Sequence, residues 1–170
     1  IQGAKTFAFD GVTNRVTFTY TTPVQTVSTG FSWNVWVWPG RNFDGDVIIG
    51  YRGTTLGPFY KLTTQKFEMY PAEVYYQLPL NTWTNVCAVY NGPAGAPSNM
   101  LMYVNGVSVG LRDADVPTLS GSTMPFYLGG DPTASEYYNS YLAVAMVYNR
   151  ALSAAEVAKN FGAHRSRFGK

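Results

Sequence analysis

The side chains that could perform chemistry in this chain are few: ten carboxylates, one histidine and one cysteine among 170 residues. A retaining glycosidase needs two carboxyl groups about 5–5.5 Å apart. Asp113 and Asp115 form an i, i+2 pair, but they precede Pro117 and are expected in a loop. The acidic residues therefore do not predict a glycosidase, and we expect no enzymatic activity.

The segment Gly-Val-Ser-Val-Gly at residues 106–110 matches the G-x-S-x-G hydrolase pattern. That pattern carries mechanism only when the serine lies on a turn from a strand to a helix. Ser108 instead follows the Asn-Gly turn of a predicted hairpin and alternates with valines. We interpret the match as accidental.

The single histidine, His164, lies in a basic tail with Arg165, Arg167 and Lys170. One histidine cannot build a histidine-rich metal site, so we expect a solvated tail. The alternative is that this basic end docks on an acidic partner or polyanion. Cys87 is the only cysteine and is expected to be a small buried hydrophobe, without an intrachain disulfide.

Calcium is the one candidate cofactor. Hard cations need several converging oxygen ligands. The candidate metal ligands are Asp44, Asp46 and Asp131, which fall in predicted loops together with Glu136 and Asn139. Acidic residues in loops are commonly turn formers instead, and the sequence defines no complete set of calcium ligands.

Aromatic side chains are the remaining candidates, because sugar rings stack on flat aromatic faces. They are Trp36, Trp38, Tyr75, Tyr76, Tyr137, Tyr138 and Tyr141. Trp36 has an alternative place in the core, since a sandwich buries large residues on both sides of a central strand. The predicted carbohydrate-binding patch is Tyr137, Tyr138, Asn139, Asp131 and Glu136.

The composition indicates the elements that must position these residues. Hydrophobic residues make up 46% and charged residues 13%, with 17 glycines and 10 prolines. Few charges and many turn formers favour an all-β sandwich in a single domain, residues 1–170. A net charge of +2 does not suggest a nucleic-acid partner, and no apolar run is long enough to cross a membrane. The chain begins at Ile1 without a signal peptide, so we expect a processed product or a piece of a longer protein.

Alternation and turn residues predict the strands. They are expected at residues 7–11, 15–20, 31–38, 47–51, 59–62, 66–70, 73–77, 82–90, 100–104, 107–111, 125–128 and 141–148. Residues 91–99 and 129–139 are expected to be loops. The last strand is uncharged and is expected to be buried on both faces. A short helix follows, with Ser153 and Glu156 as its capping box and Leu152 and Val157 as its hydrophobic staple.

Several motifs resemble the laminin-G-like, concanavalin A-like jelly-roll family. They are Phe-Asp-Gly at 9–11, Phe-Ser-Trp-Asn-Val-Trp-Val-Trp-Pro at 31–39, Trp-Thr-Asn-Val-Cys-Ala-Val-Tyr at 83–90, Tyr-Val-Asn-Gly at 103–106, Leu-Gly-Gly at 128–130 and Val-Tyr-Asn-Arg-Ala-Leu-Ser-Ala-Ala-Glu at 147–156. The resemblance implies a two-sheet antiparallel β-sandwich with one short C-terminal helix. Residues 160–169 resemble the ending of such domains in tailed-phage virion proteins.

The family implies binding more often than catalysis. Its glucanases carry E-x-D-x-x-E on one strand, which this chain lacks. Members often have Gly-x-Ile-Asp-Glu where this chain has Ser-Tyr-Leu-Ala-Val at 140–144, so the acidic residues of that segment, and any part they take in binding calcium, are missing.

These observations predict a non-catalytic recognition domain, extracellular or on a virion surface or fibre, that binds a glycan or a cell-surface polysaccharide. The alternative is a structural virion protein, such as a head decoration or fibre knob, that binds only other virion subunits. A glycoside hydrolase is a further, disfavoured alternative, and a secreted adhesion module remains open. A homotrimer is compatible with a phage surface domain, although no heptad repeat supports it.

Overall fold

The structure is a computed structural model. It describes residues 5–18, 30–41, 46–52, 56–63, 66–70, 74–91, 98–114, 126–132 and 134–170. Within these residues, the side chains of residues 51–52, 56–63, 66–70, 98–99, 111–114 and 126 are not described. Asp44 and Asp115 lie outside the described residues.

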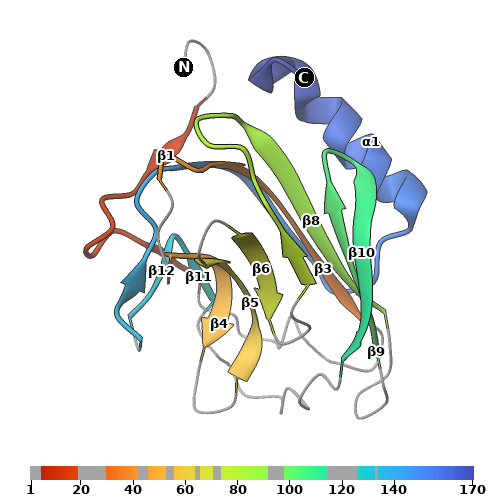
Figure 1. Ribbon diagram of the computed structural model, residues 1–170, viewed down its shortest axis with the longest axis horizontal. Helices are drawn as coiled ribbons and strands as arrows, with labels where there is room; N and C mark the ends of the chain where they lie inside the picture. The colour runs from red at the N-terminus through yellow and green to blue at the C-terminus, as the bar shows by residue number, and fades with distance from the viewer. Residues whose placement is uncertain are drawn as a thin grey trace.

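The described residues form fourteen strands, one α-helix and one 3-10 helix (Figure 1). The strands are β1 (Phe7–Ala8), β2 (Val16–Phe18), β3 (Phe31–Trp38), β4 (Asp46–Arg52), β5 (Leu56–Thr63), β6 (Lys66–Tyr70), β7 (Val74–Tyr76), β8 (Thr84–Asn91), β9 (Ser98–Val104), β10 (Val107–Ala114), β11 (Phe126–Leu128), β12 (Gly130–Asp131), β13 (Glu136–Tyr137) and β14 (Tyr141–Tyr148). The helices are α1 (Ala154–His164) and the 3-10 helix η1 (Arg165–Phe168). The all-β prediction is confirmed.

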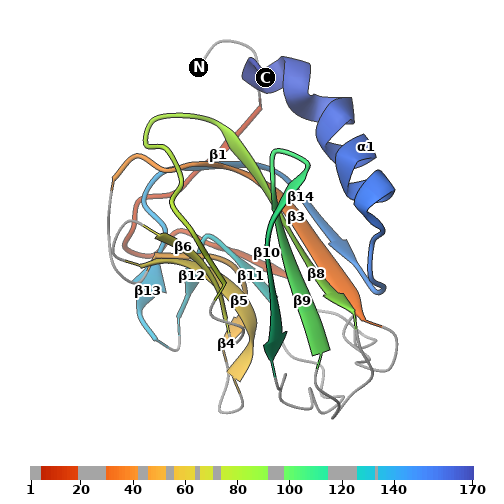
Figure 2. The ribbon, with the colours of Figure 1, turned by 45° about the vertical axis from the view of Figure 1, so that its right-hand side comes forward.

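Two antiparallel sheets make up the sandwich. Sheet A has the strand order β1-β14-β3-β8-β9-β10, and sheet B has the order β2-β11-β4-β5-β6-β7. The two sheets face each other, and α1 lies along the outer side of sheet A (Figures 1 and 2). Strands distant in sequence are neighbours, as in a jelly roll, so the fold depends on long-range pairing.

Alternate side chains of β3 point into two different apolar layers, one between the sheets and one on the outer side of sheet A. Phe31, Trp33, Val35 and Val37 belong to the core cluster between the sheets. The intervening side chains face outward, where Trp36 is fully buried in a second cluster. The interpretation of Trp36 as a core residue is confirmed. A central strand becomes buried on both faces because a helix covers its outer side.

The C-terminal tail completes this outer layer. The predicted helix is present, but the chain continues into η1, which carries Phe168 back onto sheet A. The Phe168 ring stacks on Trp36 with centroids 4.2 Å apart and meets Trp83 at 4.9 Å. Arg165, Arg167 and Lys170 are exposed, as expected for a solvated tail, but Phe168 is buried. Burying one phenylalanine offsets the cost of ordering this short segment.

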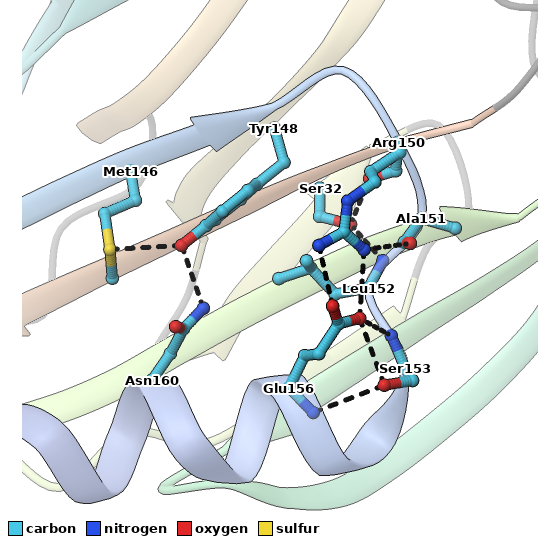
Figure 3. A network of polar contacts seen from close by, with 9 residues as sticks. All are labelled: Ser32, Met146, Tyr148, Arg150, Ala151, Leu152, Ser153, Glu156 and Asn160. Carbon is cyan, nitrogen blue, oxygen red and sulfur yellow. Dashed lines mark hydrogen bonds and ion pairs between the residues drawn. The ribbon is translucent and has the colours of Figure 1, made fainter.

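The start of α1 is held by the predicted capping box. The Glu156 N–H donates to Ser153 Oγ at 3.3 Å, and the Ser153 N–H donates to Glu156 Oε2 at 2.9 Å. Arg150 adds two bonds to the same carboxylate, 2.6 and 2.9 Å long (Figure 3). These contacts hold the pKa of Glu156 down at about 2, with the Arg150 bond as the largest cause. Leu152 and Val157 lie in one apolar cluster, as the staple requires.

The structure confirms the predicted hairpin turn and the strand position of Ser108, whereas the predictions for Asp113, for residues 129–139 and for the burial of β14 are wrong. Asn105 and Gly106 have φ of 49° and 79°, as a type I′ turn requires. Ser108 lies in β10 opposite Tyr103, so the G-x-S-x-G serine is on a strand. Asp113 is also in β10 rather than in a loop. Residues 129–139 contain the β12–β13 ribbon, and β14 has exposed positions, so it is not buried on both faces.

The segment that departs from the family pattern contains a backbone irregularity. The pairing of β14 with β3 shifts between Ala143 and Met146, and Val144 has a φ of 49°. A β-branched residue rarely adopts this conformation. Ala143 and Val144 occupy the positions of the missing acids, and both pack in the Trp36 cluster. Apolar contacts with α1 and η1 thus replace charge at this point.

No helix of the described residues is long and apolar enough to cross a membrane.

Candidate functional site

The predicted carbohydrate patch is only partly available at the surface. Tyr137 and Glu136, both half-buried, lie on β13 opposite Gly130 and Asp131 of β12. Asn139 is also half-buried, beyond the end of this ribbon. These three side chains can reach a ligand, and their role stays a prediction.

The structure contradicts direct sugar contact for Tyr138. Its ring is fully buried in the core between the sheets, and its hydroxyl donates to the Trp38 carbonyl at 2.8 Å. Burial raises the pKa of this hydroxyl far above its usual value. Neighbours in an extended chain point to opposite sides, so Tyr138 turns inward where Tyr137 does not.

Asp131 is likewise enclosed, with 1% of its surface exposed. It lies in β12, which packs beside β4. A ligand in solution cannot reach this side chain in the present conformation, so Asp131 is corrected from a contact residue to an interior one. The sequence suggested a polar loop here and did not reveal the ribbon that buries the carboxylate.

Asp46, the second described calcium candidate, is buried in an ion pair. Arg41 Nη2 approaches Asp46 Oδ1 at 3.4 Å, and the Asn139 N–H donates to Oδ2 at 3.4 Å. Burial raises the pKa of Asp46, and the bonds from Asn139 and Arg41 oppose that shift. Across the described part of the chain, no three His, Cys, Asp or Glu side chains form a group that could hold a metal. Calcium binding therefore stays a prediction that involves Asp44.

An open pocket of about 250 Å³ lies directly beside this ion pair. It is lined by Ala8, Phe9, Gly40, Arg41, Asn139, Ser140 and Tyr141. Three chain segments meet here: β1, the end of β3 and the start of β14. Among the described lining residues there is no carboxylate, histidine or cysteine; the polar groups that they offer are a guanidinium, an amide and two hydroxyls.

Two glycines shape the wall of the pocket. A Cβ on Gly11, whose φ is +74°, would lie 2.6 Å from the Asn139 Cβ. A Cβ on Gly40 would lie 2.9 Å from the Ser140 hydroxyl. The absence of side chains at both positions lets the Asp-Gly turn and the end of β3 close around residues 139–140. The Phe9 N–H completes this contact by donating to the Ser140 carbonyl at 2.9 Å.

Tyr141 connects the pocket to an aromatic row on the outer face of sheet A. It is 36% exposed and lies between Ala8 of β1 and Trp38 of β3. Trp38, half-buried, contacts Trp83 edge-on with centroids 5.8 Å apart. Opposed residues of an antiparallel pair place their side chains on the same face, so Tyr141 and Trp38 are neighbours there.

Sequence reasoning noted Tyr141 and Trp38 as aromatic residues but placed the preferred patch elsewhere. It missed Arg41 and Ser140 entirely. The signals available were the Pro39-Gly40 end of β3 and the departure from the family pattern that begins at Ser140. Neither signal indicated that the two segments meet.

A second opening, of about 500 Å³, lies along the segment after β7. It is lined by Tyr76, Gln77, Leu78, Pro79 and Leu80, and Tyr75 beside it is 44% exposed. Its described lining residues offer the Tyr76 hydroxyl and the Gln77 amide but no charged side chain, unlike the pocket that Arg41 lines. The pocket at β1 and β14 is therefore the stronger candidate site.

The sequence matches the family model described as the concanavalin A-like lectin/glucanases superfamily over residues 10–158, most of the chain. No curated protein matches the sequence.

Solved structures of similar fold include a heptameric SAP-like pentraxin from Limulus polyphemus. It has a TM-score of 0.66 and 17% identity, over 89% of this chain and 78% of the pentraxin. The binding domain of botulinum neurotoxin DC, solved with rat synaptotagmin II, has a TM-score of 0.64 and 14% identity over 88% of this chain. A structure from work on the entry of botulinum neurotoxin type C through two ganglioside molecules has a TM-score of 0.65 and 14% identity over 94%. This chain covers 40% and 45% of those two toxin chains.

Proposed function

The chain belongs to the concanavalin A-like lectin/glucanase superfamily, and from this premise we propose that it is a non-catalytic recognition domain that binds a glycan. The observation that carries the proposal is the pocket beside Tyr141, where an exposed aromatic ring meets amide, hydroxyl and guanidinium groups. Carbohydrate recognition needs this combination, because a sugar ring has an apolar face and a polar rim. The fold alone would not distinguish binding from other roles.

Each lining group has a role in the proposed contact. The Tyr141 ring offers a face for stacking, and the half-buried Asn139 amide supplies donors and acceptors for sugar hydroxyls, while Ser140, only 8% exposed, forms part of the pocket wall. Arg41 is held at the pocket by Asp46, so part of its orientation is set before a ligand arrives. Preorganised side chains lose less conformational entropy on binding, which favours affinity. Tyr137 and Glu136 can extend the contact from β13.

The similar solved structures support a recognition role by analogy. One similar toxin interacts with two ganglioside molecules, and the binding domain of another was solved in complex with rat synaptotagmin II. By analogy with the toxin that interacts with gangliosides, we propose that the ligand of this chain is a glycan. The proposed location is extracellular, on a virion surface or fibre, where the cell-surface polymer is accessible.

A glycan array of the purified domain, run with calcium and with chelator, tests the proposal. We expect specific binding that falls at least about tenfold in Tyr141→Ala, as loss of a stacking contact implies. Tyr75→Ala is the matched control, because Tyr75 is similarly exposed but lies outside the pocket lining. Loss of binding with chelator would establish a metal requirement.

A blank array under both conditions, or equal binding by wild type and Tyr141→Ala, would overturn the proposed site. The competing function is a structural virion component that binds other subunits. One observation favours it: Phe7, Val12 and Phe18 are large exposed apolar side chains near the start of the chain. Light scattering of the purified domain would then reveal self-association, including a trimer.

A further inference from the structure

We propose that the glycan site extends from the pocket along the end of sheet A to η1, beside the face that α1 covers, and takes an acidic polysaccharide with carboxylate groups. This inference rests on the proposed function and names its substrate class. Three features form the extended site: the pocket, the aromatic row of Tyr141 and Trp38, and the basic residues around η1. The first two would hold sugar rings, and the third would hold the carboxylates.

The aromatic row connects the pocket to the C-terminal turn through direct contacts. Tyr141 lines the pocket and pairs with Trp38, and Trp38 meets the edge of Trp83. Trp83 contacts Phe168 of η1 with ring centroids 4.9 Å apart, and because both rings are buried they support the path from beneath rather than contacting the glycan. The C-terminal end of the chain and β1 lie toward the same end of the molecule in Figures 1 and 2. The path from the pocket to η1 therefore runs along one end of sheet A.

The far end of this path is positively charged. Arg165, Arg167 and Lys170 are all exposed, and the Arg167 guanidinium lies 5.6 Å from the centre of the Phe168 ring. The sequence from Val157 to Lys170 contains no acidic residue. Cations near the C-terminal end of a helix stabilise the helix by interacting with its dipole. The Arg167 guanidinium lies over the Phe168 ring, which belongs to the Trp36 cluster. This position also suits it for binding an anionic sugar.

Two described carboxylates next to pocket segments, Asp46 and Asp10, already have partners. Asp46 is paired with Arg41, and Asp10 Oδ1 accepts three backbone N–H groups, from Val12, Thr13 and Asn14, at 2.9–3.0 Å. Asp10 keeps its negative charge, because these bonds lower its pKa to about 2, so the pocket end of the path has carboxylates beside Arg41, while the η1 end has excess positive charge. This asymmetry gives a bound chain a direction.

Arg165 and Arg167 suit an oxyanion, and a carboxylate is the oxyanion that belongs to the sugar ring itself in a uronic acid. A guanidinium presents parallel N–H donors that match the two oxygens of a carboxylate, whereas lysine acts as a point charge. A uronic-acid polymer combines such carboxylates with the sugar rings that the aromatic row requires.

The test compares polygalacturonate with the same polymer after methyl esterification, which removes its charge but keeps its sugars. We expect the wild-type domain to bind polygalacturonate at least about tenfold more tightly than the ester, since hydrogen bonds to a charged group are stronger than those to a neutral one. The Arg167→Gln/Lys170→Gln variant should lose most of that preference. Arg15→Gln/Lys159→Gln removes the same net charge elsewhere and is the matched control.

The outcomes separate the two proposals. If both double variants weaken binding equally, the attraction is general charge and the extended site is wrong. If polygalacturonate is not bound, or its ester is bound equally well, the acidic substrate class is wrong. A glycan-array hit that depends on Tyr141 but not on Arg167 and Lys170 would overturn this inference and leave the proposed function standing. Thermal unfolding of each variant checks that the fold is retained.

Discussion

The Leu152 N–H donates to the Ser32 hydroxyl at 2.9 Å, although the two residues are 120 positions apart in the chain. The same hydroxyl donates to the Arg150 carbonyl at 2.9 Å (Figure 3). One serine of β3 therefore satisfies both a donor and an acceptor of the turn that leads into α1. This pair of bonds fixes where the helix starts on sheet A.

Replacing Ser32 with alanine is expected to destabilise the protein by about 1–3 kcal/mol, because it leaves a buried N–H and a carbonyl without their partner. Urea unfolding measures this change. Ser108→Ala, at an exposed position of β10, is the control and should change stability by less than about 0.5 kcal/mol. Equal effects at the two serines would contradict the anchoring role of Ser32.

The lowered pKa of Glu156 predicts that the stability of the fold depends on pH. Its folded-state pKa is about 2, below the ordinary value of 4.5, with Arg150 as the largest cause. A lowered folded pKa means that the carboxylate stabilises the fold above about pH 4.5 and that this contribution is lost as the pH falls toward 2. Glu156→Gln should therefore be less stable than wild type at neutral pH, and the difference should shrink on acidification. Thermal unfolding between pH 7 and pH 2 measures it, and a constant difference would contradict the assignment.

Phe168 predicts that the C-terminal turn contributes to stability. Phe168→Ala should cost about 3 kcal/mol, the lower end of the usual range for a buried phenylalanine, because a terminal turn can readjust around the cavity. The buried ring contacts Trp36 and Trp83, so near-ultraviolet circular dichroism should also change. Phe7→Ala is the control, since Phe7 is 50% exposed. An unchanged unfolding midpoint for Phe168→Ala would show that η1 is dispensable.

The backbone conformation of Val144 predicts that replacing this residue with asparagine increases the stability of the fold. Its φ of 49° is unfavourable for a β-branched side chain, at a cost of about 1–3 kcal/mol, whereas asparagine tolerates it. Val144→Asn should raise stability by about 1 kcal/mol after the loss of some apolar contact. Ala145→Asn, at the next, exposed position, should not raise stability. A clear loss of stability in Val144→Asn would mean that contact with the Trp36 cluster outweighs the strain.

Local signals explain why much of the fold was predictable. The bounds of β3, β6 and β14 are those expected from alternation and apolar runs. The Asn105-Gly106 turn and the Ser153–Glu156 capping box depend on residues within a few positions of each other. Such interactions are encoded in short windows and do not require knowledge of the partner sheet.

The candidate site was predictable only in its chemistry. Aromatic, amide and acidic side chains were expected, but Tyr138 and Asp131 are buried while Arg41 and Ser140 line the pocket. The difference arises because the β12–β13 ribbon turns one side of its segment inward. Because side chains of a strand alternate between its two faces, a shift of one residue exchanges the buried side chains with the exposed ones.

The sequence by itself determined the fold class, most strand positions, the hairpin turn and the capped helix, because these follow from alternation and contacts within a few residues. Only the tertiary structure decided that β1, the end of β3 and the start of β14 meet around one pocket, and that Phe168 returns to Trp36. These are contacts between distant segments, and their identity depends on how two twisted sheets and a helix pack together.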